Sequence, residues 1–292
     1  MLTDQTRAKI KKLKIYTKRI MQSNLCGDYL SAFKGSGLEF DQLRDYQHGD
    51  DVRFIDWNSS AKMDKIMIKR YIQERDRTII VAVDVSASGN YSSHQELRKE
   101  VAANLAATLS FIAHLNKDKI GALLFTDRVE QWIAPSRGIA HISNILETMY
   151  AHTPRHATTS IETALRFLVS LKQRNAVVFF ISDWIDNHER YAHLLKVAGC
   201  KYDFIGVRLG DACEQQFPDI GLLDVVDPET GGVATIDTRG NHNQVNRFLS
   251  AHHQEHTHLF NKHRIDLLDI PLDQPFITPL IKFFSSRVKR QI

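Results

Sequence analysis

The sequence predicts an α/β protein with a mainly parallel sheet and helices on both faces of that sheet. From residue 78 onward, short apolar segments of strand length alternate with longer segments of helical pattern. The run Ala176–Ser182 (AVVFFIS) has no polar face, which is typical of a strand covered by helices on both sides. Strands and helices in alternation indicate βαβ units and therefore parallel pairing.

The expected strands are rich in β-branched and aromatic residues, and polar or glycine-containing segments bound them. The first, 78–83 (TIIVAV), follows charged residues and precedes a Ser/Gly/Asn loop. The segment 129–133 is expected to pair with the strand before it. We expect strands at 78–83, 120–125, 129–133, 176–182 and 202–207, and a hairpin of 222–226 and 232–236.

The expected helices carry apolar residues at helical spacing. The longest, 96–115, has an Ala/Leu/Val face, and Ser93 and Glu96 have the spacing of a capping box at its start. The segment 244–262 is polar and is expected to be a solvated helix. We expect helices at 96–115, 140–150, 160–171, 188–197, about 244–262 and 276–290.

The composition is that of an ordinary globular protein. The chain has 292 residues, 43 % hydrophobic and 25 % charged, with a net charge of +4. No apolar run approaches the ~18–20 residues of a membrane span, and residues 1–23 are too polar for a signal peptide. Cys26, Cys200 and Cys213 lie far apart, which argues against a disulfide framework or a zinc knuckle. We expect a cytoplasmic protein.

Positive charge gathers near the beginning of the chain. Residues 1–75 carry 15 basic and 10 acidic side chains, and seven of the basic ones fall between Arg7 and Arg19. The pattern there predicts a basic amphipathic helix, solvated or docked on an acidic protein or anionic surface, and nucleic acid is disfavoured. We expect residues 1–76 to hold this helix and a charged segment, and residues 77–292 to form the α/β domain with its C-terminal helix.

Oxygen-bearing side chains follow two of the expected strands. Asp84 ends the first strand and begins the pattern Asp84-x-Ser86-x-Ser88, and Asp183 directly follows the strand 176–182. Ligands of parallel sheets bind at the carboxyl ends of the strands, where these two carboxylates are expected to meet. Thr158 and Thr159 precede the helix before the second strand. Mg²⁺ prefers such oxygen ligands, and two carboxylates would balance its charge.

This pattern resembles the metal-ion-dependent adhesion site (MIDAS) of von Willebrand factor type A domains. The resemblance implies a von Willebrand factor type A-like (Rossmann-like) fold in which the hydroxyls bind the metal directly and the aspartates bind it directly or through water. It implies Mg²⁺, or Mn²⁺ or Ca²⁺, as the cofactor. Thr159 is preferred to Thr158 because Thr159-Ser-Ile resembles the family's Thr-Asp-Leu. The implied ligands are Asp84, Ser86, Ser88, Thr159 and Asp183.

Each of these residues also has a purely structural interpretation. Asp84 can make turn hydrogen bonds at the end of its strand. Thr159 and Glu162 have the spacing of a capping box, and Asp183 can cap the helix that begins near residue 187.

Further motifs resemble those of the bacterial "domain of unknown function 58" (DUF 58) family, from about Gly27 to Asp237. Members of that family are commonly encoded beside MoxR-type AAA+ ATPases, which implies an adaptor or co-chaperone partnered with such an ATPase or its client. The matching motifs are Gly35-Ser-Gly37-Leu-Glu39-Phe40, Leu43-Arg44-x-Tyr46, Gly49-Asp50-Asp51-x-Arg53-x-Ile55-Asp56-Trp57, Lys69 and Asp227-Pro228-Glu229-Thr230-Gly231.

The segment 35–75 alternates positive and negative charge. We expect it to form an ion-pair network that seats the segment on the domain, with Trp57 and Phe40 packed beneath, and a partner-docking surface is the alternative.

Enzyme motifs are weak in this chain. Ser86 stands where haloacid dehalogenase-type phosphotransferases have their second Asp, and there is no phosphate-binding glycine loop or Gly-x-Ser-x-Gly. The segment 252–256 fits the inverted zincin pattern His-x-x-Glu-His, but no Glu follows Glu255 to complete that site. We therefore expect a metal-dependent protein-interaction module and no enzyme. A metal-dependent hydrolase acting on a phosphate or peptide, and a structural module without metal, are the alternatives.

Overall fold

The computed structural model describes residues 38–73, 77–93, 96–173, 176–211, 221–239 and 242–291. They form two compact units, one within residues 38–73 and a larger one that begins at Arg77. The basic helix expected near the beginning of the chain lies outside the described residues.

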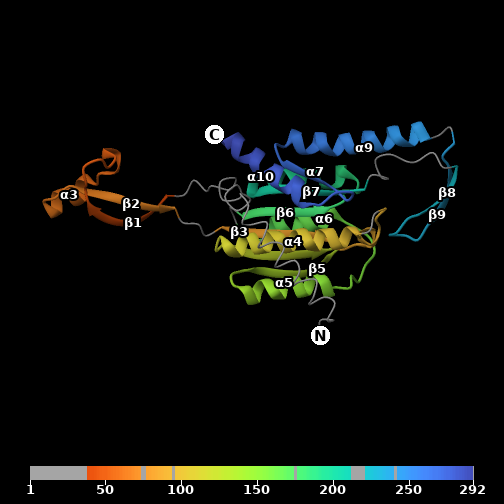
Figure 1. Ribbon diagram of the computed structural model, residues 1–292, viewed down its shortest axis with the longest axis horizontal. Helices are drawn as coiled ribbons and strands as arrows, with labels where there is room; N and C mark the ends of the chain where they lie inside the picture. The colour runs from red at the N-terminus through yellow and green to blue at the C-terminus, as the bar shows by residue number, and fades with distance from the viewer. Residues whose placement is uncertain are drawn as a thin grey trace. The chain divides into compact units, whose positions relative to one another are not determined.

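A six-stranded sheet with the order β10-β7-β6-β3-β4-β5 forms the centre of the larger unit (Figure 1). Every pair in it is parallel except β4 and β5, which are antiparallel; the sequence predicted that these two strands pair. The predicted α/β class with a mainly parallel sheet is therefore confirmed. The strands are β3 (Thr78–Asp84), β4 (Lys119–Phe125), β5 (Val129–Ser136), β6 (Ala176–Ser182), β7 (Asp203–Gly210) and β10 (Asp266–Pro271).

Strand β10 is absent from the sequence prediction. Two aspartates interrupt its short apolar run, DLLDIP, so that it lacks the pattern of a buried strand. The tertiary structure compensates for one of them, because Asp269 is in register with Arg208 of β7 and their side chains form an ion pair at 2.6 Å.

Helices cover both faces of the sheet. Two consecutive residues of β6 show this, because their side chains point to opposite faces. Phe180 belongs to a buried cluster that joins α6, α7 and α9 to the sheet, whereas the ring of Phe179 packs edge-on against Phe284 of α10. Helix α4 packs on β3, β4 and α5. The helices are α4 (Arg98–Leu115), α5 (Ile139–Ala151), α6 (Ile161–Ser170), α7 (His188–Lys201), α9 (His242–Lys262) and α10 (Ile277–Gln291). In the described part of the chain, none is long and apolar enough to cross a membrane.

Helix α4 begins two residues later than predicted, and the expected capping box is wrong. Its N-cap is Leu97, which makes no side-chain cap. The Ser93 backbone N–H and hydroxyl instead donate to the two carboxylate oxygens of Asp211, at 2.7 and 2.5 Å. Asp211 lies 118 residues away in sequence, so local spacing alone could not reveal this contact.

The predicted hairpin is confirmed as β8 (Leu222–Val226) paired with β9 (Val233–Asp237). Its side chains are largely exposed, and Leu222, Val226 and Val233 are among the exposed apolar residues of the chain. Among the described elements, neither strand packs extensively on anything but the other strand.

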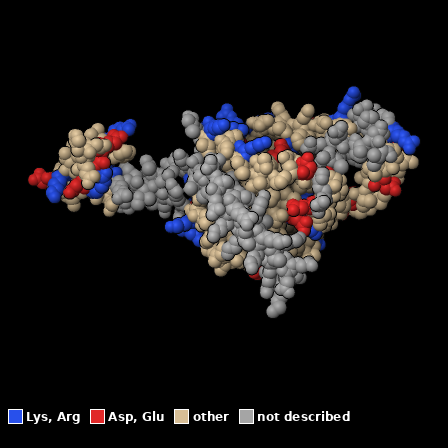
Figure 2. Space-filling model, viewed as in Figure 1, with Lys and Arg blue, Asp and Glu red and all other residues tan. Residues whose placement is uncertain are grey.

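The smaller unit is an antiparallel pair, β1 (Leu38–Asp45) and β2 (Met67–Gln73), that carries helix α3 (Trp57–Met63). The expectation that Trp57 packs beneath the charged residues is wrong, because 69 % of this residue is exposed. Figure 2 shows blue and red side chains interspersed over this unit. Ion pairs join residues of the unit to one another: Arg44–Asp50, Arg53–Asp51 and Lys69–Asp56.

Candidate metal centre

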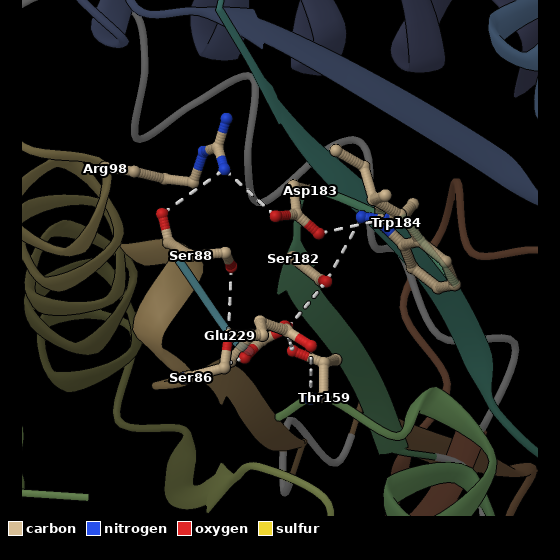
Figure 3. Close-up of polar contacts among 10 residues, drawn as sticks. Ser86, Ser88, Arg98, Thr159, Ser182, Asp183, Trp184 and Glu229 are labelled. Carbon is tan, nitrogen blue, oxygen red and sulfur yellow. Dashed lines mark hydrogen bonds and ion pairs between the residues drawn. The ribbon is translucent and has the colours of Figure 1, made fainter. Parts of the chain in front are cut away.

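Two carboxylates meet at the carboxyl edge of the sheet, as predicted. Asp84 ends β3, and Asp183 directly follows the neighbouring parallel strand β6 (Figure 3). The Asp84 carboxylate accepts hydrogen bonds from the Ser86 backbone N–H at 3.0 Å and from the Ser182 hydroxyl at 2.9 Å. Burial and the nearby charge of Asp183 raise the pKa of Asp84 to about 7. A cation at this edge would offset that destabilisation of the charged form.

The two predicted serines also converge. Ser86 is buried, and its Oγ lies 3.0 Å from the Oγ of Ser88 in the short 3-10 turn that follows β3. The alternation of Asp84-x-Ser86-x-Ser88 therefore brings both hydroxyls together beside the carboxylate.

Thr159 lies just before α6, but it does not cap that helix. The N-cap is Ser160, whose hydroxyl oxygen accepts a hydrogen bond from the Thr163 backbone N–H. The Thr159 hydroxyl donates to Oε1 of Glu229 at 2.8 Å, and its backbone N–H donates to Oε2 at 3.3 Å. Thr158, the alternative considered from the sequence, is exposed.

The Asp183 carboxylate forms a buried ion pair with Arg98, the first residue of α4. The distance from Arg98 Nη1 to Asp183 Oδ2 is 2.9 Å, and only 5 % and 4 % of the two side chains are exposed. The other carboxylate oxygen accepts a hydrogen bond from the Ile185 backbone N–H at 3.1 Å. The capping role considered for Asp183 belongs to Asn187, which caps α7. A cation would therefore contact Asp183 through water or compete with Arg98 for it.

Trp184 holds the loop that carries Asp183. Its backbone is left-handed, with φ at 61°, although its side chain is almost fully buried. The indole N–H donates to the Val207 carbonyl oxygen at 3.2 Å, and the ring packs against Phe180 and Phe260. These contacts stabilise an otherwise unfavourable backbone conformation directly after the carboxylate.

Arg98 and Glu229 lie at the site, although the sequence does not predict either of them there. Arg98 is one basic side chain at the start of an apolar helix, a common arrangement that indicates no partner. Glu229 lies in the motif Asp227-Pro228-Glu229-Thr230-Gly231, which was noted only as a family resemblance. Figure 3 shows its carboxylate at Thr159. Burial raises the pKa of Glu229, and the charge of Asp183 adds to this effect.

The donors fit a small, hard cation in chemistry, because hydroxyl and carboxylate oxygens are the ligands that Mg²⁺ prefers. Ser86 and Ser88 are hydrogen-bonded to each other at 3.0 Å, and Thr159 is hydrogen-bonded to Glu229 at 2.8 Å. A cavity of about 10 Å³, room for about one water molecule, is lined partly by Asp84, Ser88 and Asp183. Within the described ranges, no group of three or more His, Cys, Asp or Glu could hold a metal, so this site depends on its hydroxyls.

The His-rich segment has a different environment from the one predicted. Helix α9 is not simply solvated, because His256, Leu259 and Phe260 are buried. His256 Nδ1 lies 3.0 Å from the Tyr191 hydroxyl oxygen, and its Nε2 lies 3.3 Å from Nε2 of His252. Burial, followed by nearby positive charge, lowers the pKa of His256 to about 3. The groups that contribute this charge are His252, His188, Arg208 and His253.

Acid should therefore destabilise the larger unit through His256. In the unfolded chain a histidine has a pKa of about 6.5, so below that pH the unfolded state binds a proton that the folded state excludes. The contribution of His256 to the free energy of unfolding should fall by roughly 1.4 kcal/mol per pH unit, or about 2 kcal/mol by pH 5. Asp84, whose pKa is raised, acts in the opposite direction over the same range, because its folded state binds a proton that its unfolded state does not. Urea unfolding at pH 7 and pH 5 therefore isolates the His256 contribution as a difference between variants.

The matched variants are His256→Gln and His193→Gln, the second at an exposed position of α7. Between pH 7 and pH 5, His256→Gln should lose about 2 kcal/mol less free energy of unfolding, or gain about 2 kcal/mol more, than the unmodified chain, and His193→Gln should match the unmodified chain. An equal change in both variants would show that His256 makes no such contribution.

Comparisons with known proteins place the chain in a family. A family model described as "Protein of unknown function DUF58" matches residues 42–258. The "Uncharacterized protein Rv1480" of Mycobacterium tuberculosis (strain ATCC 25618 / H37Rv) is 23 % identical over 284 residues, which cover 96 % of this chain and 89 % of the relative.

Solved structures with similar folds include an aerotolerance-related membrane protein from Bacteroides fragilis NCTC 9343. It has a TM-score of 0.49 and 14 % identity, covering 73 % of this chain and 99 % of that one. The SpRpn10 VWA domain has a TM-score of 0.41 and 10 % identity, covering 73 % and 94 %. The larger unit itself has the expected α/β fold, a mainly parallel six-stranded sheet with helices on both faces. Because the family model spans most of the sequence, the chain belongs to the DUF58 family.

Proposed function

We propose that this chain is a metal-dependent protein-interaction module that binds an acidic residue of a partner protein. The family and the fold suggest an interaction module. The observation that best supports metal dependence is the convergence of Asp84, Ser86 and Ser88 at one sheet edge, with hydroxyl oxygens 3.0 Å apart. In this proposal the site binds and does not catalyse.

Each proposed ligand has a distinct task. Asp84 supplies a buried negative charge, held in place by Ser86 and Ser182. Ser86, Ser88 and Thr159 supply neutral oxygens, which leave net positive charge on the cation. Bound Mg²⁺, Mn²⁺ or Ca²⁺ supplies the charge that attracts a carboxylate from outside. Asp183 tunes that charge through water or through its pair with Arg98.

The proposed partner is a MoxR-type AAA+ ATPase or its client, with this chain as an adaptor or co-chaperone in the cytoplasm. The support for this partner is the resemblance in family motifs alone. It implies that an acidic side chain of the ATPase or the client approaches the carboxyl edge of the sheet.

Mg²⁺ should raise the melting temperature of the full chain, because a ligand that binds only the native state stabilises it. At about a hundredfold excess over Kd the gain is ~2.7 kcal/mol, or roughly 5–10 °C for a domain of about 150–250 residues. Differential scanning fluorimetry in Mg²⁺ and in EDTA, at constant ionic strength, measures the shift. Asp84→Asn should abolish it, whereas Asp224→Asn, at an exposed carboxylate of β8, should preserve it.

Two results would contradict the proposal. If Mg²⁺ does not change the melting temperature of the unmodified chain, the result would favour a structural module. In that module Arg98 alone, without a metal ion, would neutralise Asp183. Binding of the purified ATPase that is equal for Asp84→Asn and Asp224→Asn would move the interface away from this site. The variants are needed for that second test because the ATPase itself binds Mg²⁺ with its nucleotide.

A further inference from the structure

Glu229 reaches the site from a hairpin that is otherwise largely exposed. The turn between β8 and β9 is closed by its own hydrogen bonds, since Asp227 accepts from the Glu229 and Gly231 backbone N–H groups and donates its own to Gly232. Gly231 has a φ of +71°, which suits this tight turn. The turn contacts a residue just before α6, through the hydrogen bonds between Glu229 and Thr159 (Figure 3). The hairpin thus presents one side chain, in a defined position, to the edge of the sheet.

That side chain has the chemistry of the partner group that the proposed function requires. A metal site of this kind recognises a carboxylate, and the Glu229 carboxylate already lies at the predicted ligand Thr159. Oε1 accepts from the Thr159 hydroxyl at 2.8 Å.

Among the residues that the structure describes, the charges that act on Glu229 are negative, and no positive one explains its position. Its hydrogen-bond partners are a hydroxyl and a backbone N–H of Thr159, both neutral. The charges of Asp183 and Asp227 act on it as repulsion. A half-buried carboxylate held among like charges is in an unfavourable position unless a cation joins the cluster.

We propose that Glu229 is an intramolecular ligand of the metal site, which occupies the place of a partner's acidic residue and closes the site until that partner displaces it. This inference rests on the proposed function and adds its regulation. The hairpin is suited to the task because β8 and β9 pack mainly on each other, so the arm can leave the site without exposing the core of the sheet domain.

Mn²⁺ binding to the full chain tests the inference directly, with free Mn²⁺ quantified by electron paramagnetic resonance. Glu229→Gln keeps the size of the side chain but removes its charge, and it should weaken Mn²⁺ binding by at least about tenfold, as loss of even an indirect ligand contact does. Asp224→Asn removes one charge from the same hairpin, away from the site, and should leave the Mn²⁺ Kd unchanged. Hydrogen exchange of the turn amides, 227–232, should slow on addition of Mn²⁺ in the unmodified chain and not in Glu229→Gln.

The outcomes separate the inference from the proposed function. Equal Mn²⁺ affinity for the unmodified chain and Glu229→Gln, with unchanged exchange of the turn, would overturn the intramolecular ligand and leave the metal site standing. Absence of Mn²⁺ binding in the unmodified chain would overturn both. If Mn²⁺ binds more weakly to Asp224→Asn as well as to Glu229→Gln, the effect would come from the overall negative charge of the hairpin. That result would also overturn the inference. Circular dichroism of each variant without metal confirms that the hairpin substitutions leave the fold intact.

Discussion

Arg98→Met should lower the free energy of unfolding by about 3–5 kcal/mol, because breaking a buried ion pair leaves one charge without compensation. Arg98 and Asp183 are almost fully buried, and 2.9 Å separates their charged atoms. Methionine preserves much of the apolar stem of the arginine, so the loss reports mainly on the charge. Urea unfolding at pH 7 measures it.

Two further variants test whether the unpaired charge of Asp183 causes this loss of stability. Asp183→Asn combined with Arg98→Met removes that charge and should recover a large part of the loss. Arg166→Met breaks an exposed pair with Glu162 on α6, in which 69 % of the arginine side chain is exposed, and should cost less than about 1 kcal/mol. Similar losses for Arg98→Met and Arg166→Met would contradict the special importance of the buried pair.

Trp184→Ala should destabilise the larger unit by about 3–5 kcal/mol, the usual cost of truncating a buried aromatic residue. The indole packs between Phe180 and Phe260 and donates to the carbonyl of Val207. Residue 184 itself has the left-handed backbone and directly follows Asp183, so without the indole contacts this part of the loop is no longer held in place. We therefore expect weaker metal binding as well as lower stability, measured by urea unfolding and by Mn²⁺ titration.

Trp57→Ala is the matched control, since Trp57 is 69 % exposed on α3. It should change the stability by no more than about 0.5 kcal/mol. A loss of stability in Trp184→Ala with an unchanged Mn²⁺ Kd would mean that the tryptophan supports the core but does not position the site.

The Arg98–Asp183 pair changes how the candidate site is understood. The resemblance to adhesion sites predicted Asp183 as a metal ligand, yet one of its oxygens is paired with a guanidinium. Two cations would then share one carboxylate, which lowers the negative charge available to the metal and strengthens its attraction for an external acid. Glu229, which accepts a hydrogen bond from Thr159, is an acid of this chain placed to respond to that attraction.

Much of the candidate site was predictable because the proposed ligands follow local rules. Asp84, Ser86 and Ser88 are spaced so that a turn after a strand brings them together. The position of Asp183 follows from parallel pairing, since the ends of adjacent parallel strands share one edge of the sheet. Thr159 was harder to assign, because its spacing to Glu162 also suited a helix cap, and only the structure shows that Ser160 has that role.

The contacts that the sequence did not reveal are those between residues that lie far apart along the chain. Ser93 contacts Asp211, Arg98 contacts Asp183, and Thr159 contacts Glu229, at sequence separations of 118, 85 and 70. No periodicity or local spacing encodes such pairs. Strand β10 escaped detection for the same reason, because its aspartate is compensated by Arg208 of another strand.

The sequence by itself determined the α/β class, most of the strands and helices, the family and the oxygen-rich edge of the sheet. These follow from short-range patterns of hydrophobicity, turn residues and motif spacing, which act within a few residues along the chain. Only the tertiary structure decided which charges are paired, which tryptophan is buried, and that a glutamate from a remote hairpin lies at the predicted site. Those outcomes depend on long-range packing, because burial makes an unpaired charge costly and so selects partners by proximity in space.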